Sequence, residues 1–192
     1  MFNMVIFGPP GCGKGTQAAK IVENYNLLHI STGDLIRKEI SQNTILGKIY
    51  DKFNRRGILV PDDLILKEIF RYAVMNRDAK GFVFDGFPRN LYQAQMLDRV
   101  FAKKQYKIEL VVSIDVPEDE LIARVLERGK TSGRIDDNEV VMHNRLLIYF
   151  SQTQPVIDYY KRTKRLYEVD GNQSIETVAS LIDEKIKKVM GK

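Results

Sequence analysis

Glycines and a lysine near the N-terminus have a spacing that can bind phosphate. Residues 8–14 read Gly-Pro-Pro-Gly-Cys-Gly-Lys, which matches the phosphate-loop pattern G-x-x-x-x-G-K. Glycine allows consecutive backbone N–H groups to turn toward phosphate oxygens, and Lys14 adds a mobile positive charge. An apolar run at 4–7 precedes the loop, and apolar residues at helical spacing follow it over 18–25. This context favours a nucleotide phosphate site over an ordinary glycine-rich turn.

The position after Lys14 departs from the usual pattern. It is occupied by Gly15 instead of serine or threonine, and Thr16 comes one residue later. A direct Mg²⁺ ligand from that hydroxyl is therefore not expected. Since Mg²⁺ gives up its waters reluctantly, we expect nucleotide oxygens and waters to hold most of its coordination shell.

Short apolar runs alternate with helical patterns along the chain, which favours an α/β fold with a parallel sheet covered on both faces. Strands are expected at 4–7, 82–84, 110–116 and, more weakly, 166–169, with a strand end near His29. Helices are expected to begin near Asp62 and Pro117, the second ending at Gly129, and a last one near Ile175. Pro155 predicts a kink or break in a helical stretch over 139–160.

Two polar segments, 31–60 and 129–138, fit this alternation poorly and are expected to be appendages on the core. The length of 192 residues suits a single domain. No apolar run is long enough to span a bilayer, and no signal peptide is expected. The single cysteine excludes an intramolecular disulfide and a cysteine-rich zinc site, which favours a reducing cytoplasm.

The formal net charge of +5 is compatible with a nucleic-acid partner, a small polyanionic substrate or simply a basic surface. The basic residues are dispersed, and no aromatic RNA-binding signature accompanies them. We therefore expect neither nucleic acid nor a membrane as a partner. His29 and His143 have no second histidine or cysteine nearby, so neither is expected to bind a metal.

The full loop sequence at 8–17, Gly-Pro-Pro-Gly-Cys-Gly-Lys-Gly-Thr-Gln, resembles the loop of the adenylate kinase family, and the resemblance covers nearly the whole chain in order. It implies a parallel five-stranded sheet of the P-loop NTPase type, flanked by helices, with strand order 2-3-1-4-5. Residues 1–192 would form one kinase domain that contains an AMP-binding insert at 31–60 and a short lid loop at 129–138. The implied reaction is reversible phosphoryl transfer from Mg-ATP to AMP, which gives two ADP.

The resemblance also implies residue roles. Residues matched to the ATP side are Gly11, Cys12, Gly13, Lys14, Gly15, Thr16, Arg124, Arg128 and Gln173. Residues matched to the AMP side are Thr32, Gly33, Arg37, Leu59, Val60, Gly86, Phe87, Arg89, Gln93, Arg134 and Arg145. Lys14, Arg89, Arg128, Arg134 and Arg145 would be catalytic, and Asp85 would lie beside the metal's water shell. Thr32 is also a plausible helix cap, and Asp136 and Asp137 would orient the arginines.

Several alternatives remain open at this point. The pyrimidine (UMP/CMP) monophosphate kinases resemble the chain strongly, but they typically have alanine and asparagine where it has Thr32 and Gln93. A GTP-binding switch protein usually carries an Asn/Thr-Lys-x-Asp motif, which is absent here. The third alternative is a basic nucleic-acid binder without catalysis. The family reading implies small-molecule partners only, ATP and AMP, with Mg²⁺ as cofactor, no structural zinc and a monomeric protein.

Overall fold

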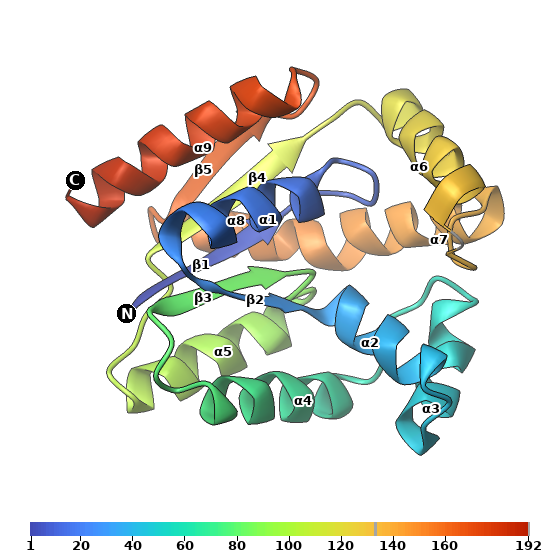
Figure 1. Cartoon of the computed structure of the whole chain (residues 1–192), viewed down its shortest axis with the longest axis horizontal. Helices are drawn as coiled ribbons and strands as arrows, with labels where there is room; N and C mark the ends of the chain where they lie inside the picture. Colours follow the sequence, from blue (N-terminus) through green and yellow to red (C-terminus); the bar gives the residue numbers. More distant parts are fainter. Residues whose placement is uncertain (133, 192) are drawn as a thin grey trace.

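The computed structural model describes residues 1–132 and 134–191, so Gly133 of the expected lid loop lies outside the described residues. A parallel sheet forms the centre (Figure 1). Its strands are β1 (Phe2–Phe7), β2 (Leu28–Ser31), β3 (Gly81–Asp85), β4 (Leu110–Asp115) and β5 (Leu166–Asp170). They pair in the order β2-β3-β1-β4-β5, all parallel, which confirms the expected five-stranded α/β sheet.

Helices follow each strand, as the alternation predicts. They are α1 (Lys14–Tyr25), α2 (Thr32–Ser41), α3 (Ile45–Asn54), α4 (Asp62–Met75), α5 (Leu91–Lys103), α6 (Glu118–Ser132), α7 (Glu139–Ile148), α8 (Gln154–Arg162) and α9 (Ile175–Met190). A π-helical segment, η1 (Tyr149–Thr153), joins α7 to α8. Among the described residues, no helix combines the length and apolar character needed to cross a membrane.

β1, β3 and β4 are buried on both faces, which explains their nearly continuous apolar sequences. Alternate residues point to opposite faces, so Val5 and Phe84 pack with α4, α5 and α8, whereas Met4 and Val83 pack with α1 and α9. Each face therefore has its own apolar core. The strands β1 and β3 therefore lie between the two cores.

The carboxyl ends of the strands meet at one edge of the sheet, where ligands bind in open α/β sheets. β1 leads there into the glycine-rich loop and α1, and β3 ends there at Asp85. Helices α2 and α3 extend beyond this edge on one side, and α6 and α7 extend beyond it on the other (Figure 1). The sheet thus places the loop and Asp85 between two projecting helical pairs.

Two expected helix boundaries are wrong. α6 does not end at Gly129 but continues to Ser132. A Cβ atom at Gly129 would lie 2.6 Å from the carbonyl oxygen of Asp137, so this glycine permits the close approach of the returning chain. Thr32 is not the cap of α2: the Ser31 hydroxyl accepts the hydrogen bond from the backbone N–H of Asp34.

The expected break near Pro155 is confirmed. Proline has no N–H to donate and crowds the preceding turn, and the backbone widens to the π-helical segment η1 immediately before it. Tyr149 and Thr153 are the first and last residues of this segment. Both side chains contribute to the cavity described below.

Candidate active site

The glycine-rich loop has the backbone conformation that its sequence predicts. Gly11 and Gly13 have φ values of +90° and +92°, in the left-handed region that favours glycine. At Gly8 a Cβ atom would lie 2.3 Å from the Cys12 sulfur, so the buried cysteine fills the space beneath the loop. Lys14 begins α1, and its ammonium donates to the carbonyl of Pro9 at 3.2 Å. The loop therefore presents both its lysine and the N-terminus of a helix to the same space.

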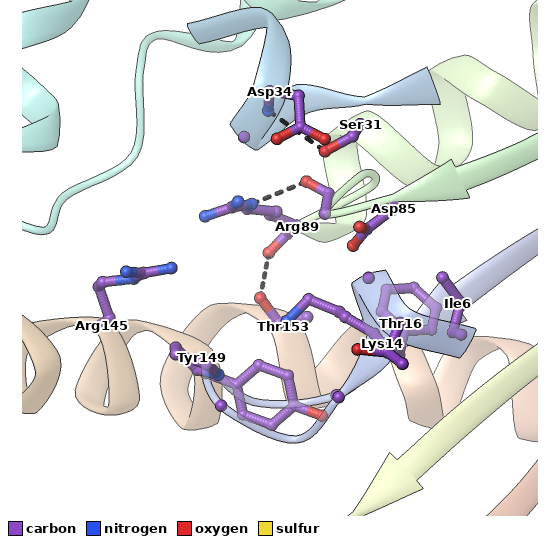
Figure 2. A pocket seen from close by; sticks show the side chains of 18 of the residues that line it. Ile6, Lys14, Thr16, Ser31, Asp34, Asp85, Arg89, Arg145, Tyr149 and Thr153 are labelled. Carbon is purple, nitrogen blue, oxygen red and sulfur yellow. Dashed lines mark hydrogen bonds between the residues drawn. The ribbon is translucent and has the colours of Figure 1, made fainter. Parts of the chain in front are cut away.

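A cavity of about 550 Å³ opens above this loop. Figure 2 shows Lys14, Arg89 and Arg145 reaching toward it from α1, the β3–α5 loop and α7. The cationic side chains that line it are Lys14, Arg37, Arg89, Arg128, Arg134 and Arg145. Gly11, Gly13, Gly15 and Thr16 also line it. We call this space the large chamber.

A second space, of about 50 Å³ and called here the small chamber, adjoins the first beneath α2 and the α3–α4 loop. Part of its wall is aliphatic, formed by Ile36, Ile58, Leu59, Val60 and Ile65, and Asn54 and Asp136 also line it. Thr32 and Gln93 contribute polar groups. The residues that line both chambers include Gly33, Arg37, Gly86, Arg89 and Arg145. Three of the cations therefore lie at the junction of the large chamber and the small one.

Asp85 supplies the buried carboxylate of the large chamber and is 8% exposed. Burial alone would raise the pKa of Asp85, but the His29 imidazole and the Lys14 charge outweigh it and hold the pKa below its usual range. His29 Nε2 lies 3.5 Å from Asp85 Oδ2. Asp85 is therefore an ionised oxygen donor beside the phosphate loop. The described residues contain no cluster of three or more metal-ligating side chains that could hold an ion alone.

Aspartates orient two of the arginines, as the sequence predicts. Arg128 binds Asp137 through two hydrogen bonds of 2.7 Å, from Nε and Nη2. Arg145 Nη1 donates to Asp136 Oδ2 at 2.8 Å. Such planar, charge-assisted pairs fix the guanidinium planes. The turn after α6 therefore positions cations from two different helices.

Arg89 is held through its own backbone and side chain. Its Nε donates to the Gly86 carbonyl at 2.7 Å, and its carbonyl accepts from the Thr153 hydroxyl at 2.9 Å (Figure 2). Burial, followed by the charge of Arg145, lowers the pKa of Arg89 to about 10. The guanidinium therefore remains charged at neutral pH while it experiences the repulsion of its neighbours.

Four of the expected contact residues line neither chamber. Cys12 and Phe87 are buried in the two cores. Arg124 donates to Glu120 and to the Gly171 carbonyl, at 2.8 and 3.2 Å, and Gln173 lies beside Asp170 in the next loop. Any contact of Cys12 with a nucleotide would have to come from its backbone.

The structure also contains site residues that the sequence reasoning missed. Thr153 and Tyr149, which were not predicted, line the large chamber. Asp62, expected only to favour a helix start, accepts hydrogen bonds from two side-chain amides of α5 and its cap. In the sequence, only Pro155 indicated an irregular segment near η1. No feature of the local sequence distinguishes the role of Asp62 from that of its neighbour Asp63.

The fold and the loop define a phosphate-loop nucleotide-binding protein whose cations face two adjoining chambers. The family model for adenylate kinase matches residues 6–165. A protein named adenylate kinase from Bacteroides thetaiotaomicron is 43% identical over 98% of this chain and 100% of its own length. Adenylate kinases from Flavobacterium psychrophilum and Porphyromonas gingivalis are 43% and 41% identical, over 97% and 98% of this chain and 98% and 99% of their own lengths. The chain belongs to the adenylate kinase family.

Proposed function

We propose that the two chambers hold the two substrates of one reaction, the reversible transfer of a phosphoryl group from ATP to AMP. Family membership supports this ATP:AMP phosphotransferase activity. The observation that carries the assignment of the chambers is the position of their cations. Arg37, Arg89 and Arg145 line both spaces, and Lys14 reaches only the large one. Two anionic nucleotides could therefore meet at the junction without prohibitive repulsion.

The small chamber would hold AMP. Its aliphatic walls suit the flat, weakly polar ring of a base, and Thr32 and Gln93 provide hydrogen-bonding groups. Arg37 and Arg89 at its mouth would bind the α-phosphate, with Arg145. Gly33 and Gly86 allow close approach because they carry no side chain. Because many residues of the small chamber belong to the segment 31–60, this assignment supports that segment as the AMP-binding insert.

The large chamber would hold the triphosphate of ATP. The loop from Gly11 to Thr16 would surround the β- and γ-phosphates with N–H groups, and Lys14 would neutralise their outer oxygens. Arg128, Arg134 and Arg145 would stabilise the charge that develops on the transferring group. Arg124 and Gln173 would contact the adenosine end of ATP.

Transfer in this arrangement needs no general base. An oxygen of the AMP phosphate forms a bond to the γ-phosphorus, and the bond from that phosphorus to the β–γ bridging oxygen breaks. The attacking oxygen is already ionised near pH 7, since the second phosphate pKa is about 6. The protein would act through positioning and charge stabilisation, as in other phosphoryl transfers.

The residues present fit a magnesium ion bound with ATP. Asp85 is an ionised carboxylate in the same chamber as Thr16, and Mg²⁺ usually pairs one or two carboxylates with phosphate oxygens and waters. Asp85 would hold waters of that shell. The ion would supply positive charge that offsets the charge of the phosphates.

Exclusion of water would depend on the projecting segments. We assign residues 129–138 as the short lid and expect it to close with the insert at 31–60, since an exposed γ-phosphate could otherwise transfer to water. The partners would be ATP and AMP alone, with a monomeric enzyme in the cytoplasm. The single, buried Cys12 is consistent with a reducing compartment.

The first test measures ADP formed from Mg-ATP with AMP, CMP, UMP or GMP in separate reactions. We expect rapid transfer to AMP, and a loss of about a hundredfold or more in kcat for Lys14→Ala and Arg89→Ala. Lys20→Ala and Arg71→Ala are matched controls, because both cations are exposed and outside the chambers; they should stay within about twofold. A preference for CMP or UMP would assign the chain to pyrimidine substrates and contradict the proposal.

A further inference from the structure

The amide of Gln93 is one of the polar groups that line the small chamber beside its aliphatic residues. This side chain is 2% exposed and is already hydrogen-bonded at both of its polar atoms. Its Oε1 accepts from the backbone N–H of Arg89 at 2.7 Å, and its Nε2 donates to Asp62 Oδ1 at 2.7 Å. The amide is thus clamped between the loop before α5 and the first residue of α4.

These partners determine which way round the amide lies. A backbone N–H can only donate, and a carboxylate oxygen can only accept. Turning the amide over would place its NH₂ group against the Arg89 N–H and its oxygen against Asp62. Both contacts would then be between like groups, and each buried group would lose its partner. The order of donor and acceptor at Gln93 is therefore fixed.

Asn90 strengthens the same arrangement. Its Oδ1 accepts from the backbone N–H of Gln93 at 2.9 Å, which caps α5, and its Nδ2 donates to Asp62 Oδ1 at 2.9 Å. One carboxylate oxygen on α4 therefore receives two amide groups from the start of α5. Asp62 itself lines neither chamber, so it can affect a ligand there only through these amides.

The clamped amide of Gln93 retains one N–H and one lone pair for a ligand. A base with an exocyclic amino group beside a ring acceptor nitrogen can pair with both of these. A 6-oxo purine presents a carbonyl acceptor and a ring N–H donor in the reversed order. The Gln93 amide could pair with both groups of such a base only if it were flipped by 180°. Asp62 opposes that flip, because its carboxylate would then face the amide oxygen.

We propose that Asp62 is a positioning residue that makes the small chamber select 6-amino over 6-oxo purine monophosphates, because it holds the Gln93 amide in one orientation. This inference rests on the proposed function, since it assumes that the small chamber binds the acceptor base. Sites built to hydrogen-bond one pattern reject the reversed pattern, because their buried groups are left unpaired.

A purely local role for Asp62 would be that of a negative charge that favours the N-terminus of α4. Asp63 provides the matched comparison. It lies in the same helical turn and carries the same charge, but it is exposed and has no bond to Gln93 or Asn90 among the hydrogen bonds of the described residues. A helix-charge effect would appear in both positions, whereas an effect on the amide would appear only at Asp62.

The experiment measures kcat/KM for AMP and for IMP, with Mg-ATP as donor. AMP and IMP differ at the purine 6-position, amino against oxo, and in the protonation of the adjacent ring nitrogen. We expect Asp62→Ala, and Asp62→Ser as a polar helix start that is too short to reach the amide, to lower the AMP/IMP ratio about tenfold. Asp62→Asn should restore most of the ratio, because one amide oxygen can accept both bonds. Asp63→Ala should leave it unchanged.

An equal fall for AMP and IMP in Asp62→Ala and Asp62→Ser would overturn the inference, since a merely structural role lowers both alike. An unchanged ratio in these variants would also overturn it. If the unaltered enzyme transferred nothing to AMP, the proposed function itself would fail first. Transfer to AMP with a ratio insensitive to Asp62 would refute only the present inference.

Discussion

At the scale of single residues, the ion pair between Arg128 and Asp137 shows how the site keeps its cations in place. The Asp137 side chain is fully covered, with 0% exposure. Burial alone would raise the pKa of Asp137, but the hydrogen bonds from Arg128 and the charge of Arg145 lower it below its usual range. A carboxyl whose pKa is depressed by folding stabilises the protein above its unfolded pKa and loses that contribution as pH falls through the folded value.

We therefore expect Asp137→Asn to reduce the free energy of unfolding by about 2 kcal/mol at pH 7. The difference from the unaltered protein should begin to shrink below about pH 4, where Asp137 becomes protonated in the unfolded chain, and should shrink further as pH falls through the lower pKa of the folded state. Urea unfolding at pH 7, 4 and 3 measures this. Glu127→Gln, which breaks an exposed pair with Lys130 on the same helix, should cost less than about 0.5 kcal/mol. If the difference in free energy of unfolding between Asp137→Asn and the unaltered protein were the same at all three pH values, the ionised Asp137 carboxylate would not be its cause.

At the scale of elements, the π-helical segment η1 connects the helix that carries Arg145 to the loop that carries Arg89. Thr153 at its end donates to the Arg89 carbonyl and lies 64 positions away in sequence. Without that bond the Arg89 loop would retain its core contacts but lose an anchor beside the junction of the chambers. The element thus acts on the site through a single hydroxyl.

Thr153→Val keeps the shape of this side chain and removes the donor. We expect kcat to fall about tenfold, because a small displacement of a cation that stabilises the transition state is costly. Steady-state rates with AMP and ATP measure the effect. Thr163→Val removes a comparable hydroxyl from the other end of α8, where it bonds Tyr160 and Arg165 away from the chambers, and kcat should not change. Equal losses in both variants would contradict the role of Thr153.

The contact between the insert and α7 gives a second prediction at this scale. Asn144 Nδ2 donates to the Arg56 carbonyl at 3.1 Å, and the adjacent Gly57 lines both chambers with a φ of +66°. A Cβ atom at Gly57 would lie 2.7 Å from the carbonyl oxygen of Val141 on α7. Glycine is therefore required both by the backbone conformation and by the close approach.

We expect Gly57→Ala to raise the KM for AMP about tenfold, because it pushes one wall of the small chamber away from α7. The KM for ATP should change much less. Gly191→Ala is the matched control: its φ is +69°, and nothing lies within 4 Å of the added atom. It carries the same backbone strain at the end of α9. An equal rise in both KM values for Gly57→Ala would contradict a selective effect on the small chamber.

The sequence predicted which strands and helices exist more accurately than the residues at which they begin and end. The buried strands were predictable because burial on both faces leaves continuous apolar runs. The phosphate loop was predictable because its backbone conformation requires glycine at fixed positions. Gly129 was misread as a helix end because its purpose is contact with Asp137, which no local pattern reveals. Pro155 signalled a break, but its form as a π-helical turn depends on packing.

At the scale of the whole molecule, the site depends on contacts between distant segments, and these were the least predictable. Asp62 and Gln93 are 31 positions apart, and the role of Asp62 appears only when α4 and α5 pack side by side. The family resemblance identified the arginines of the site, a residue type that binds phosphate well. It also supplied Asp136 and Asp137, which orient two of them, but not Thr153, which anchors the Arg89 loop, or Asp62, which holds the Gln93 amide. The residue types that contact a ligand are determined by the chemistry of that ligand. The residues that hold them in place can lie on any element that packs nearby, so their positions in the sequence follow no fixed spacing.

The concentration of positive charge gives the last prediction. The chain carries a net charge of +5, and Lys14, Arg37, Arg89, Arg128, Arg134 and Arg145 all line one chamber. Their mutual repulsion is evident in the lowered pKa of Arg89, to which burial contributes first and Arg145 next. A polyanion that enters the chamber relieves this repulsion only in the folded state. Binding of such an anion should therefore raise the thermal stability of the protein.

We expect inorganic tripolyphosphate at about a hundred times its Kd to stabilise the fold by about 2.7 kcal/mol. For a chain of this size that corresponds to a rise in Tm of about 5–10 °C. Raising the salt from 0.05 to 0.5 M at a fixed tripolyphosphate concentration should reduce the rise, because salt screens charges. Adenosine at the same concentration should produce a much smaller and salt-insensitive rise. If Arg89→Ala and Arg71→Ala responded to tripolyphosphate equally, the stabilisation would come from the general surface charge, since Arg71 is exposed and outside the chamber.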